Sequence, residues 1–334
     1  MSEVRIITVS SDDEGQRMDR WIKKNAPDLP YVLVQKLLRK GQIRVDGKRA
    51  KPDTKLSAGQ EVRLPPYSGD RVQEKKKISD EEIDVIRSLV IYDDGDVIAL
   101  NKPQGWAVQG GTNTNQHIDG LLEALVNEKG VKPRLVHRLD KDTSGVLLLA
   151  RSAKIARALG FAFKGRDVKK TYWELVSPVP EIYDGTIKAP LIKAGGSNKE
   201  RMRIDNEDGK PAVTEYKVVE VAGSEIAFVA FWPRTGRTHQ IRVHAEYMGC
   251  PILGDGKYNH RDIQHEHEKI DLDGMHLARR LHLHAQRLVL PHPAQPQKIL
   301  DISAPLPPEL AKSWKKLGFD ANLKDDPFED MKRS

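Results

Sequence analysis

Short apolar segments, many of them alternating with polar residues, recur along most of this 334-residue chain. A period of two is typical of strands with one buried face, and apolar runs bounded by turn residues are typical of strands buried on both faces. A turn rich in Asp and Gly at 93–96 separates two such runs and predicts a hairpin. Strands are expected at 43–48, 61–64, 89–92, 97–100, 146–150, 169–176, 213–221, 226–232 and 281–290.

Apolar residues at helical spacing predict fewer helices than strands. The helices are expected at 19–24, 31–40, 116–129 and 153–163. Gly41 and Gly130 are typical of helix ends, and Ser152 is typical of an N-terminal cap. Because strands and helices do not alternate strictly, the pattern favours an α+β fold over a doubly wound sheet.

Composition divides the chain into a small N-terminal unit at 1–66 and a large domain at 83–317. The linker between them, 67–82, is polar and contains three consecutive lysines, so we expect the small unit to be mobile. The last residues, 318–334, are charged and poor in apolar side chains. They are expected to form a loose C-terminal tail.

The formal net charge is +7, and basic residues outnumber acidic ones in the N-terminal unit. Such a concentration favours a polyanionic partner, because basic side chains neutralise phosphates and release counterions. The unit is therefore predicted to carry a nucleic-acid-binding face. The basic residues expected on it are Arg20, Lys36, Arg39, Lys40, Arg44 and Lys48.

Cys250 is the only cysteine, which excludes an intrachain disulfide and a cysteine-rich zinc site. The first eight residues lack the apolar core of a signal peptide, and no apolar run approaches the roughly 18–20 residues of a membrane span. These features predict a cytoplasmic protein that does not contact membranes.

Two polar motifs carry side chains suited to catalysis. The first, HRLDKDTSG at 137–145, places Arg138 and Asp140 in a loop directly before an apolar strand. A loop held by a rigid scaffold can present such groups in a cleft. The second, RTGRTHQIRVH at 234–244, lies about a hundred residues further on. Together with the basic N-terminal unit, the two motifs point to chemistry on RNA.

Other interpretations of the first motif are weaker. Asp140, Asp142 and Ser144 fit the start of a calcium loop, but position twelve is Arg151, where such loops need a bidentate Glu. A glycosidase pair of Asp140 and Asp142 would need a defined spacing across a sugar, which the sequence does not establish. For Asp142, Thr143 and Ser144 we favour structural roles, as turn caps or partners of backbone groups.

These motifs, with others in the same order, resemble the RluA-type pseudouridine synthases. The segments that carry the resemblance are 137–140 with 143–145, 101–105 with Val108, 169–176, 234–244 with 249–255, and 283–285. They cover most of residues 85–305. The N-terminal unit, through 38–47, resembles an S4 RNA-binding domain. The combination is similar to the RluC/RluD branch, which modifies large-subunit ribosomal RNA.

The resemblance implies that Asp140 is the catalytic nucleophile, that Tyr172 packs against the target base, and that Arg242 pairs with Asp140. Covalent attack would divide the breakage of the N1–C1′ bond and the formation of the C5–C1′ bond into easier steps. Attack on the base and attack on the ribose both stay open. Arg138 is a candidate for filling the space of a flipped base, although a local salt bridge explains it nearly as well. Arg237 and His239 are candidates for shaping their loop or contacting RNA.

The resemblance also implies a mixed, largely antiparallel sheet with flanking helices, and a small α/β S4 unit. It implies isomerisation of uridines in large-subunit (23S) ribosomal RNA, or in its assembly intermediates, by a monomer that needs no cofactor and no metal. Two rivals remain. A catalytically inert S4-containing ribosome-binding factor would not need Asp140, Tyr172 and Arg242 together. A metal-dependent hydrolase would use the histidine-rich segment at 260–276, which lacks His-Glu-x-x-His spacing.

Overall fold

The computed structural model describes residues 4–67, 78–110, 117–165, 168–195, 201–259 and 271–331. The chain folds into two compact units, Met1–Lys77 and Ile78–Ser334. Most of the predicted linker, 68–77, lies outside the described residues, so its mobility stays a prediction. The predicted start of the large domain at residue 83 is too late. Helix α3 (Asp80–Ser88) begins with a reciprocal capping box between Ser79 and Glu82.

The N-terminal unit is a small antiparallel sheet with two helices. Its elements are β1 (Arg5–Thr8), the 3-10 turn η1 (Ser11–Asp13), α1 (Met18–Asn25), α2 (Tyr31–Arg39), β2 (Arg44–Val45), β3 (Lys48–Arg49) and β4 (Glu61–Leu64). The strand order is β1-β4-β2-β3. Both predicted helices are confirmed. They bury one apolar face each, including Trp21 of α1 and Leu38 of α2, in a core shared with the strands.

The second unit is built on one large mixed sheet. Its strands are β5 (Val90–Asp93), β6 (Val97–Lys102), β7 (Arg134–Leu135), β8 (Ser144–Ala150), β9 (Lys169–Val176), β10 (Asp184–Lys188), β13 (Val213–Ala222), β14 (Ile226–Pro233), β15 (Leu283–Pro291) and β16 (Ile299–Ser303). The order is β10-β13-β14-β9-β15-β8-β6-β5, with β16 beside β15 and β7 beside β8. Only the β8–β15 pair is parallel among the described strand pairs. A separate hairpin joins β11 (Leu191–Lys193) to β12 (Met202–Ile204). The predicted α+β fold with a largely antiparallel sheet is confirmed.

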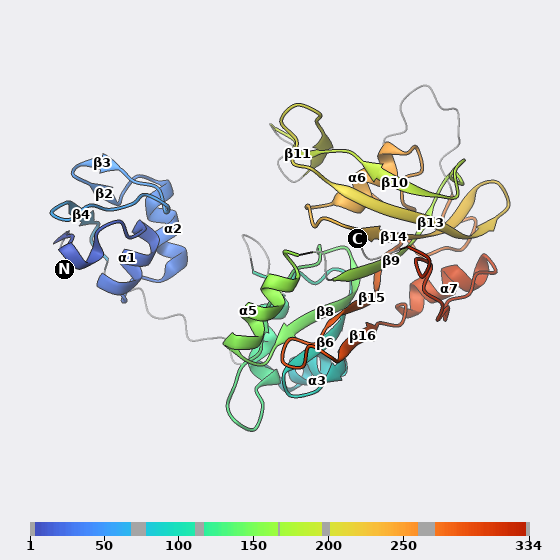
Figure 1. The fold of residues 1–334 in the computed structure, drawn as a ribbon, viewed down its shortest axis with the longest axis horizontal. Helices are drawn as coiled ribbons and strands as arrows, with labels where there is room; N and C mark the ends of the chain where they lie inside the picture. Colours follow the sequence, from blue (N-terminus) through green and yellow to red (C-terminus); the bar gives the residue numbers. More distant parts are fainter. Residues whose placement is uncertain are drawn as a thin grey trace. The chain divides into compact units, whose positions relative to one another are not determined.

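Helices cover both faces of the sheet half that contains β6 and β8 (Figure 1). Alternate residues of these strands point to opposite faces, so an apolar run can supply two cores. Val146 and Leu148 of β8 pack toward α5 (Ala153–Ala162). Leu147 and Leu149 pack toward α3 and α4 (Ile118–Leu121). The predicted cap of α5 is confirmed, because the Ser152 side chain accepts a hydrogen bond from the Ile155 N–H.

The other half of the sheet is covered in the same way. Ile241 and Ala245 of α6 (Gln240–Tyr247) pack on one face of β9, β13 and β14. Leu310 and Trp314 of α7 (Pro308–Lys316) pack on the other. The tight packing of α6 positions the chemistry, because the second polar motif runs directly into this helix.

Two predictions about local structure are wrong. The expected helix at 116–129 is only α4 followed by the 3-10 turn η2 (Leu122–Leu125). The Asn127 side chain accepts the backbone N–H groups of Lys129 and Val131, which offers this segment an alternative to helical hydrogen bonding.

The described part of the expected loose tail, 318–331, is packed against the sheet. Phe328 is 1% exposed and contacts Trp232, and Phe319 is buried against the aromatic cluster around α7. Lys169 of β9 pairs with Asp326 and donates to the Phe328 carbonyl oxygen. A few well-spaced aromatic side chains anchor a segment whose overall composition is polar.

Candidate active site

Asp140 lies in the loop between β7 and β8, at the edge of the parallel strand pair. Its side chain is 22% exposed. The fully buried Lys102 side chain fixes this loop through hydrogen bonds to backbone carbonyl groups. The Lys102 ammonium donates to the carbonyl oxygens of Pro103 (2.9 Å), Trp106 (2.9 Å) and Lys141 (3.3 Å). Burial lowers the pKa of Lys102 to about 7, while the negative charges of Asp140 and Asp142 oppose that shift.

The start of the same loop is fixed by His137. Its Nε2 atom accepts the Leu148 N–H at 2.8 Å, and its ring stacks on Phe163 at 4.4 Å between centroids. Burial lowers the pKa of His137 to about 3, so the ring is neutral and serves as an acceptor. The Ser144 hydroxyl bonds the His284 ring and accepts from Arg280, and no backbone partner is found for it among the described residues, contrary to one suggested role. The loop is therefore anchored at both ends.

The arginine-rich motif forms the turn between β14 and α6. Gln240 organises it: its amide nitrogen donates to the Val213 carbonyl oxygen and the Thr214 hydroxyl, both at 2.9 Å. Its amide oxygen accepts the Thr235 hydroxyl (2.7 Å) and the Arg237 N–H (3.0 Å). Every polar atom of the buried Gln240 amide thus fixes the path of this turn.

Arg242 of α6 forms a buried bidentate ion pair with Asp255. Nε and Nη2 each lie 2.6 Å from an Asp255 carboxylate oxygen, and the two side chains are 3% and 0% exposed. The predicted direct pairing of Arg242 with Asp140 is therefore not found. The remaining nitrogen, Nη1, lies 4.0 Å from Asp142 and has no hydrogen-bond partner among the described residues. It is a charged donor on the wall of the cavity described next.

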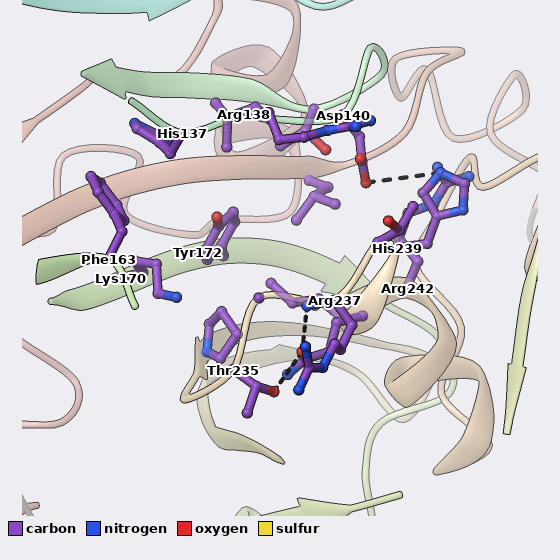
Figure 2. Close-up of a pocket in the computed structure, with 18 residues that line it drawn as sticks. His137, Arg138, Asp140, Phe163, Lys170, Tyr172, Thr235, Arg237, His239 and Arg242 are labelled. Carbon is purple, nitrogen blue, oxygen red and sulfur yellow. Dashed lines mark hydrogen bonds and ion pairs between the residues drawn. The ribbon is translucent and has the colours of Figure 1, made fainter. Parts of the chain in front are cut away.

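The two motifs meet around a cavity of about 270 Å³ (Figure 2). Asp140, Arg138 and His137 line one side, and 235–242 lines another. The Asp140 Oδ2 atom is 3.9 Å from Nε2 of His239. Tyr172 and Lys170 of β9 also line the cavity. The structure thus brings together all three predicted catalytic residues and the three RNA-binding candidates of the large domain.

Tyr172 is a neutral phenol in this environment. Burial, reinforced by the negative charge of Asp140, raises the pKa of Tyr172 well above its ordinary value. The phenolate that could take a proton from C5 is therefore the minor form. The residue is suited to packing against a base and donating a hydrogen bond.

The remaining candidates differ in their surroundings. Arg138 is exposed and has no ion-pair partner in the described ranges, so a local salt bridge does not account for it. Arg237 donates through Nε to the Pro211 carbonyl oxygen, which gives it a role in shaping the loop. In the N-terminal unit, the six basic candidates named above are all exposed.

Known proteins are similar to this chain in sequence over most of its length. A family model described as RNA pseudouridylate synthase matches residues 96–247. The ribosomal large subunit pseudouridine synthase C of Escherichia coli (strain K12) is 35% identical over 320 residues, which span 94% of this chain and 97% of that protein. The chain belongs to the RNA pseudouridylate synthase family. The protein of the same name from Salmonella typhimurium is 36% identical over 309 residues, 91% of this chain and 93% of that one.

Two solved structures of this family have a similar fold. Human RNA pseudouridylate synthase domain containing 4 has a TM-score of 0.59 and 28% identity, covering 71% of this chain and 97% of its own. Human RNA pseudouridylate synthase domain containing 1 has a TM-score of 0.51 and 26% identity, covering 66% and 85%. The family predicted from the motifs is confirmed.

The metal-site alternative has little structural basis in the described ranges. Most of the histidine-rich segment, 260–270, lies outside them. Within them, no group of three or more His, Cys, Asp or Glu side chains is arranged to hold a metal ion. In the same ranges, no helix has both the length and the apolar character needed to cross a bilayer.

Sequence reasoning missed Glu174, which is fully buried on β9 two residues after Tyr172. Neither carboxylate oxygen has a hydrogen-bond partner among the described residues. Burial, with a smaller contribution from the Asp255 charge, raises the pKa of Glu174 well above its ordinary value, although Arg242 opposes the shift. The carboxyl group is therefore neutral in the folded protein.

Replacing Glu174 with Gln is expected to stabilise the protein at alkaline pH. Because its pKa is raised on folding, Glu174 favours the folded state below its unfolded pKa of about 4.5, and this advantage declines as pH rises toward the folded pKa. Between these two pKa values, each unit of rising pH lowers the free energy of unfolding of the wild-type protein by about 1.4 kcal/mol. Thermal melting of both proteins from pH 5 to pH 9 should show a difference that grows with pH. Glu225→Gln, on an exposed turn, is the control and should show no such growth.

Proposed function

We propose that this protein isomerises uridine to pseudouridine in large-subunit ribosomal RNA, with Asp140 as nucleophile. The observation that carries the proposal is the position of Asp140 on a cavity lined by Tyr172 and Arg242. The near full-length similarity to proteins named for the large ribosomal subunit supports the choice of RNA. We further propose that it acts as a cytoplasmic monomer, on free ribosomal RNA or on an assembling subunit.

In this reaction the N1–C1′ bond breaks, the uracil turns within the cavity, and C5 bonds to C1′. The C5 proton leaves and N1 is protonated, so the change is redox-neutral and the residues named above suffice without a cofactor. The target base must first be extruded from the RNA. Arg138, exposed at the rim, is positioned to occupy the space that it leaves. The Nη1 atom of Arg242, which has no hydrogen-bond partner among the described residues, supplies positive charge beside the reacting groups.

A second basic surface lies on α5, the helix whose C-terminal end reaches the cavity. Phe163 lines the cavity at the C-terminal end of α5, and two residues before it Phe161 is 77% exposed. Lys154, Arg157 and Lys164 are exposed on the same helix or just after it. Exposed aromatic rings among cations are typical of surfaces that bind single-stranded RNA by stacking and phosphate contacts. This surface supports RNA as the substrate.

Release of tritium from ribosomal RNA labelled at C5 of uridine tests the proposed function. The wild-type protein should release tritium from large-subunit RNA and not from small-subunit RNA. Binding without release from any ribosomal RNA preparation would instead support the inert S4-containing binding factor.

We propose that the N-terminal unit is an S4-type domain that binds phosphates through its exposed basic residues. Replacing Lys36, Arg39 and Lys40 with Gln should weaken RNA binding and flatten its salt dependence. The slope of log K against log salt should change by about 0.7–0.9 for each lost contact. Filter binding from 50 to 300 mM salt measures the slope. The matched control replaces Lys312, Lys315 and Lys316 of α7, also exposed, and an equal change there would refute the assignment.

A further inference from the structure

Tyr258 lies beneath the arginine-rich turn and is fully buried. Its hydroxyl oxygen is 2.8 Å from the Met202 backbone nitrogen and 2.7 Å from Nδ1 of His239. Its own backbone N–H is held by Asp255, the partner of Arg242. The turn at 255–258 thus holds two cavity-lining side chains: Asp255 pairs with Arg242, and the Tyr258 hydroxyl bonds His239.

Counting protons determines the direction of these hydrogen bonds. The Met202 N–H can only donate, so the Tyr258 oxygen accepts from it. The single hydroxyl hydrogen then has Nδ1 of His239 as its acceptor. If Nδ1 carried a proton instead, the buried hydroxyl hydrogen would have no acceptor among the described residues. Leaving a buried hydrogen-bond donor unpaired is unfavourable, which disfavours the form protonated at Nδ1.

The consequence appears at the other ring nitrogen. Burial lowers the pKa of His239, so the imidazole is neutral and carries one proton. With Nδ1 acting as acceptor, that proton sits on Nε2, which faces the Asp140 carboxylate at 3.9 Å. This separation exceeds a hydrogen bond, and catalytic contacts of unliganded enzymes often shorten only when substrate binds.

The backbone conformation of His239 also indicates that this residue is held in place by its surroundings. Its φ angle is +52°, in the left-handed region that side chains other than glycine seldom adopt. Residues in this strained backbone conformation occur where surrounding contacts enforce it, and they cluster at functional sites. The Tyr258 hydroxyl and the start of α6 provide those contacts.

We infer that Tyr258 is a positioning residue that fixes His239 as the Nε2–H tautomer and thereby presents an N–H donor to Asp140. The donor would orient the carboxylate and keep it ionised until attack. This role in catalysis rests on the proposed function. The tautomer itself does not, and it can be measured without substrate.

The test uses the full-length protein labelled with ¹⁵N-histidine, observed by long-range ¹H–¹⁵N NMR. His239→Gln assigns the His239 signals by their disappearance. In the wild type, His239 should be neutral with Nδ1 unprotonated, and Tyr258→Phe should give a mixture of tautomers. A wild-type ring protonated at Nδ1, or a tautomer unchanged in Tyr258→Phe, overturns the inference. The wild-type spectrum decides even if the variant folds poorly.

Kinetics separate positioning from general destabilisation. Tyr258→Phe should lower kcat for tritium release about tenfold, the effect of one lost hydrogen bond, with an unchanged KM for RNA because the side chain is fully buried. In the His239→Gln background the same substitution should have no further effect, since the residue it positions is gone. Additive losses would refute the inference. Tyr216→Phe, another buried tyrosine, is the control and should keep wild-type kcat. Absence of wild-type release would refute the proposed function and leave the tautomer result standing.

Discussion

Asp140→Asn is expected to abolish tritium release from ribosomal RNA while leaving the fold intact. The amide has nearly the same shape as the carboxylate but cannot act as a nucleophile, so we expect a loss of more than about 10⁴-fold, or about 5.5 kcal/mol in the barrier. Stability should change by less than about 1 kcal/mol, because the side chain is partly exposed and its contact with the neutral His239 ring is 3.9 Å long. Single-turnover tritium release and filter binding measure the two effects separately.

The neighbouring Asp142 provides the matched control. It lies in the same loop and is 43% exposed, and its one ion pair within the described ranges is the 4.0 Å contact with Arg242. Asp142→Asn therefore changes the charge of the loop by the same amount but should keep activity within about tenfold. If Asp140→Asn retains activity at the level of Asp142→Asn, Asp140 is not the nucleophile. Equal, complete losses in both would indicate that the charge of the loop matters and not the identity of one carboxylate.

Much of the scaffold is predictable from the sequence, because buried strands have a local pattern of apolar residues. The run Val146–Ala150 is apolar at every position, and the structure buries each of these residues between α5 on one side and α3 with α4 on the other. The two catalytic motifs were likewise recognisable as polar loops attached to such strands. Their meeting around one cavity depends on the parallel β8–β15 pair and on β9 beside it, which no local pattern specifies.

The parts that were missed depend on contacts between distant residues. In the alternating segment at 169–176, Glu174 looks like a solvent-facing residue, and only the packing of the sheet shows that it is fully buried. The partner of Arg242 is Asp255, thirteen residues away across a turn, although Asp140 was the carboxylate expected from the family resemblance. Phe328 anchors a segment whose charged composition predicted a loose tail. Each case reflects burial imposed by tertiary structure on a locally polar sequence.

Arg242→Met is expected to have the largest effect on stability of any change in the site. It leaves the Asp255 carboxylate, 0% exposed, without the cation that balances its burial. Removing one partner of a buried ion pair typically costs about 3–5 kcal/mol, because the other charge stays desolvated. The backbone N–H groups of Lys257 and Tyr258 still bond Asp255, so we expect the lower part of this range. Tritium release should also be lost, because Nη1 is the charged donor on the cavity wall.

Arg287→Met is the matched control. It shows how much stability is lost when a bidentate arginine–aspartate pair is broken at a partly exposed position. Arg287 pairs with Asp301 through the same two nitrogens, at 2.6 and 2.5 Å, but these side chains are 23% and 44% exposed. Exposed pairs contribute up to about 1 kcal/mol, so denaturant unfolding should show a much smaller loss for Arg287→Met. The double variant Arg242→Met/Asp255→Leu removes both buried charges and should recover most of the stability, but none of the activity. Equal losses for Arg242→Met and Arg287→Met would mean that burial of the Arg242–Asp255 pair does not govern its energetics. Recovery of tritium release in the double variant would mean that Arg242 acts only through the fold.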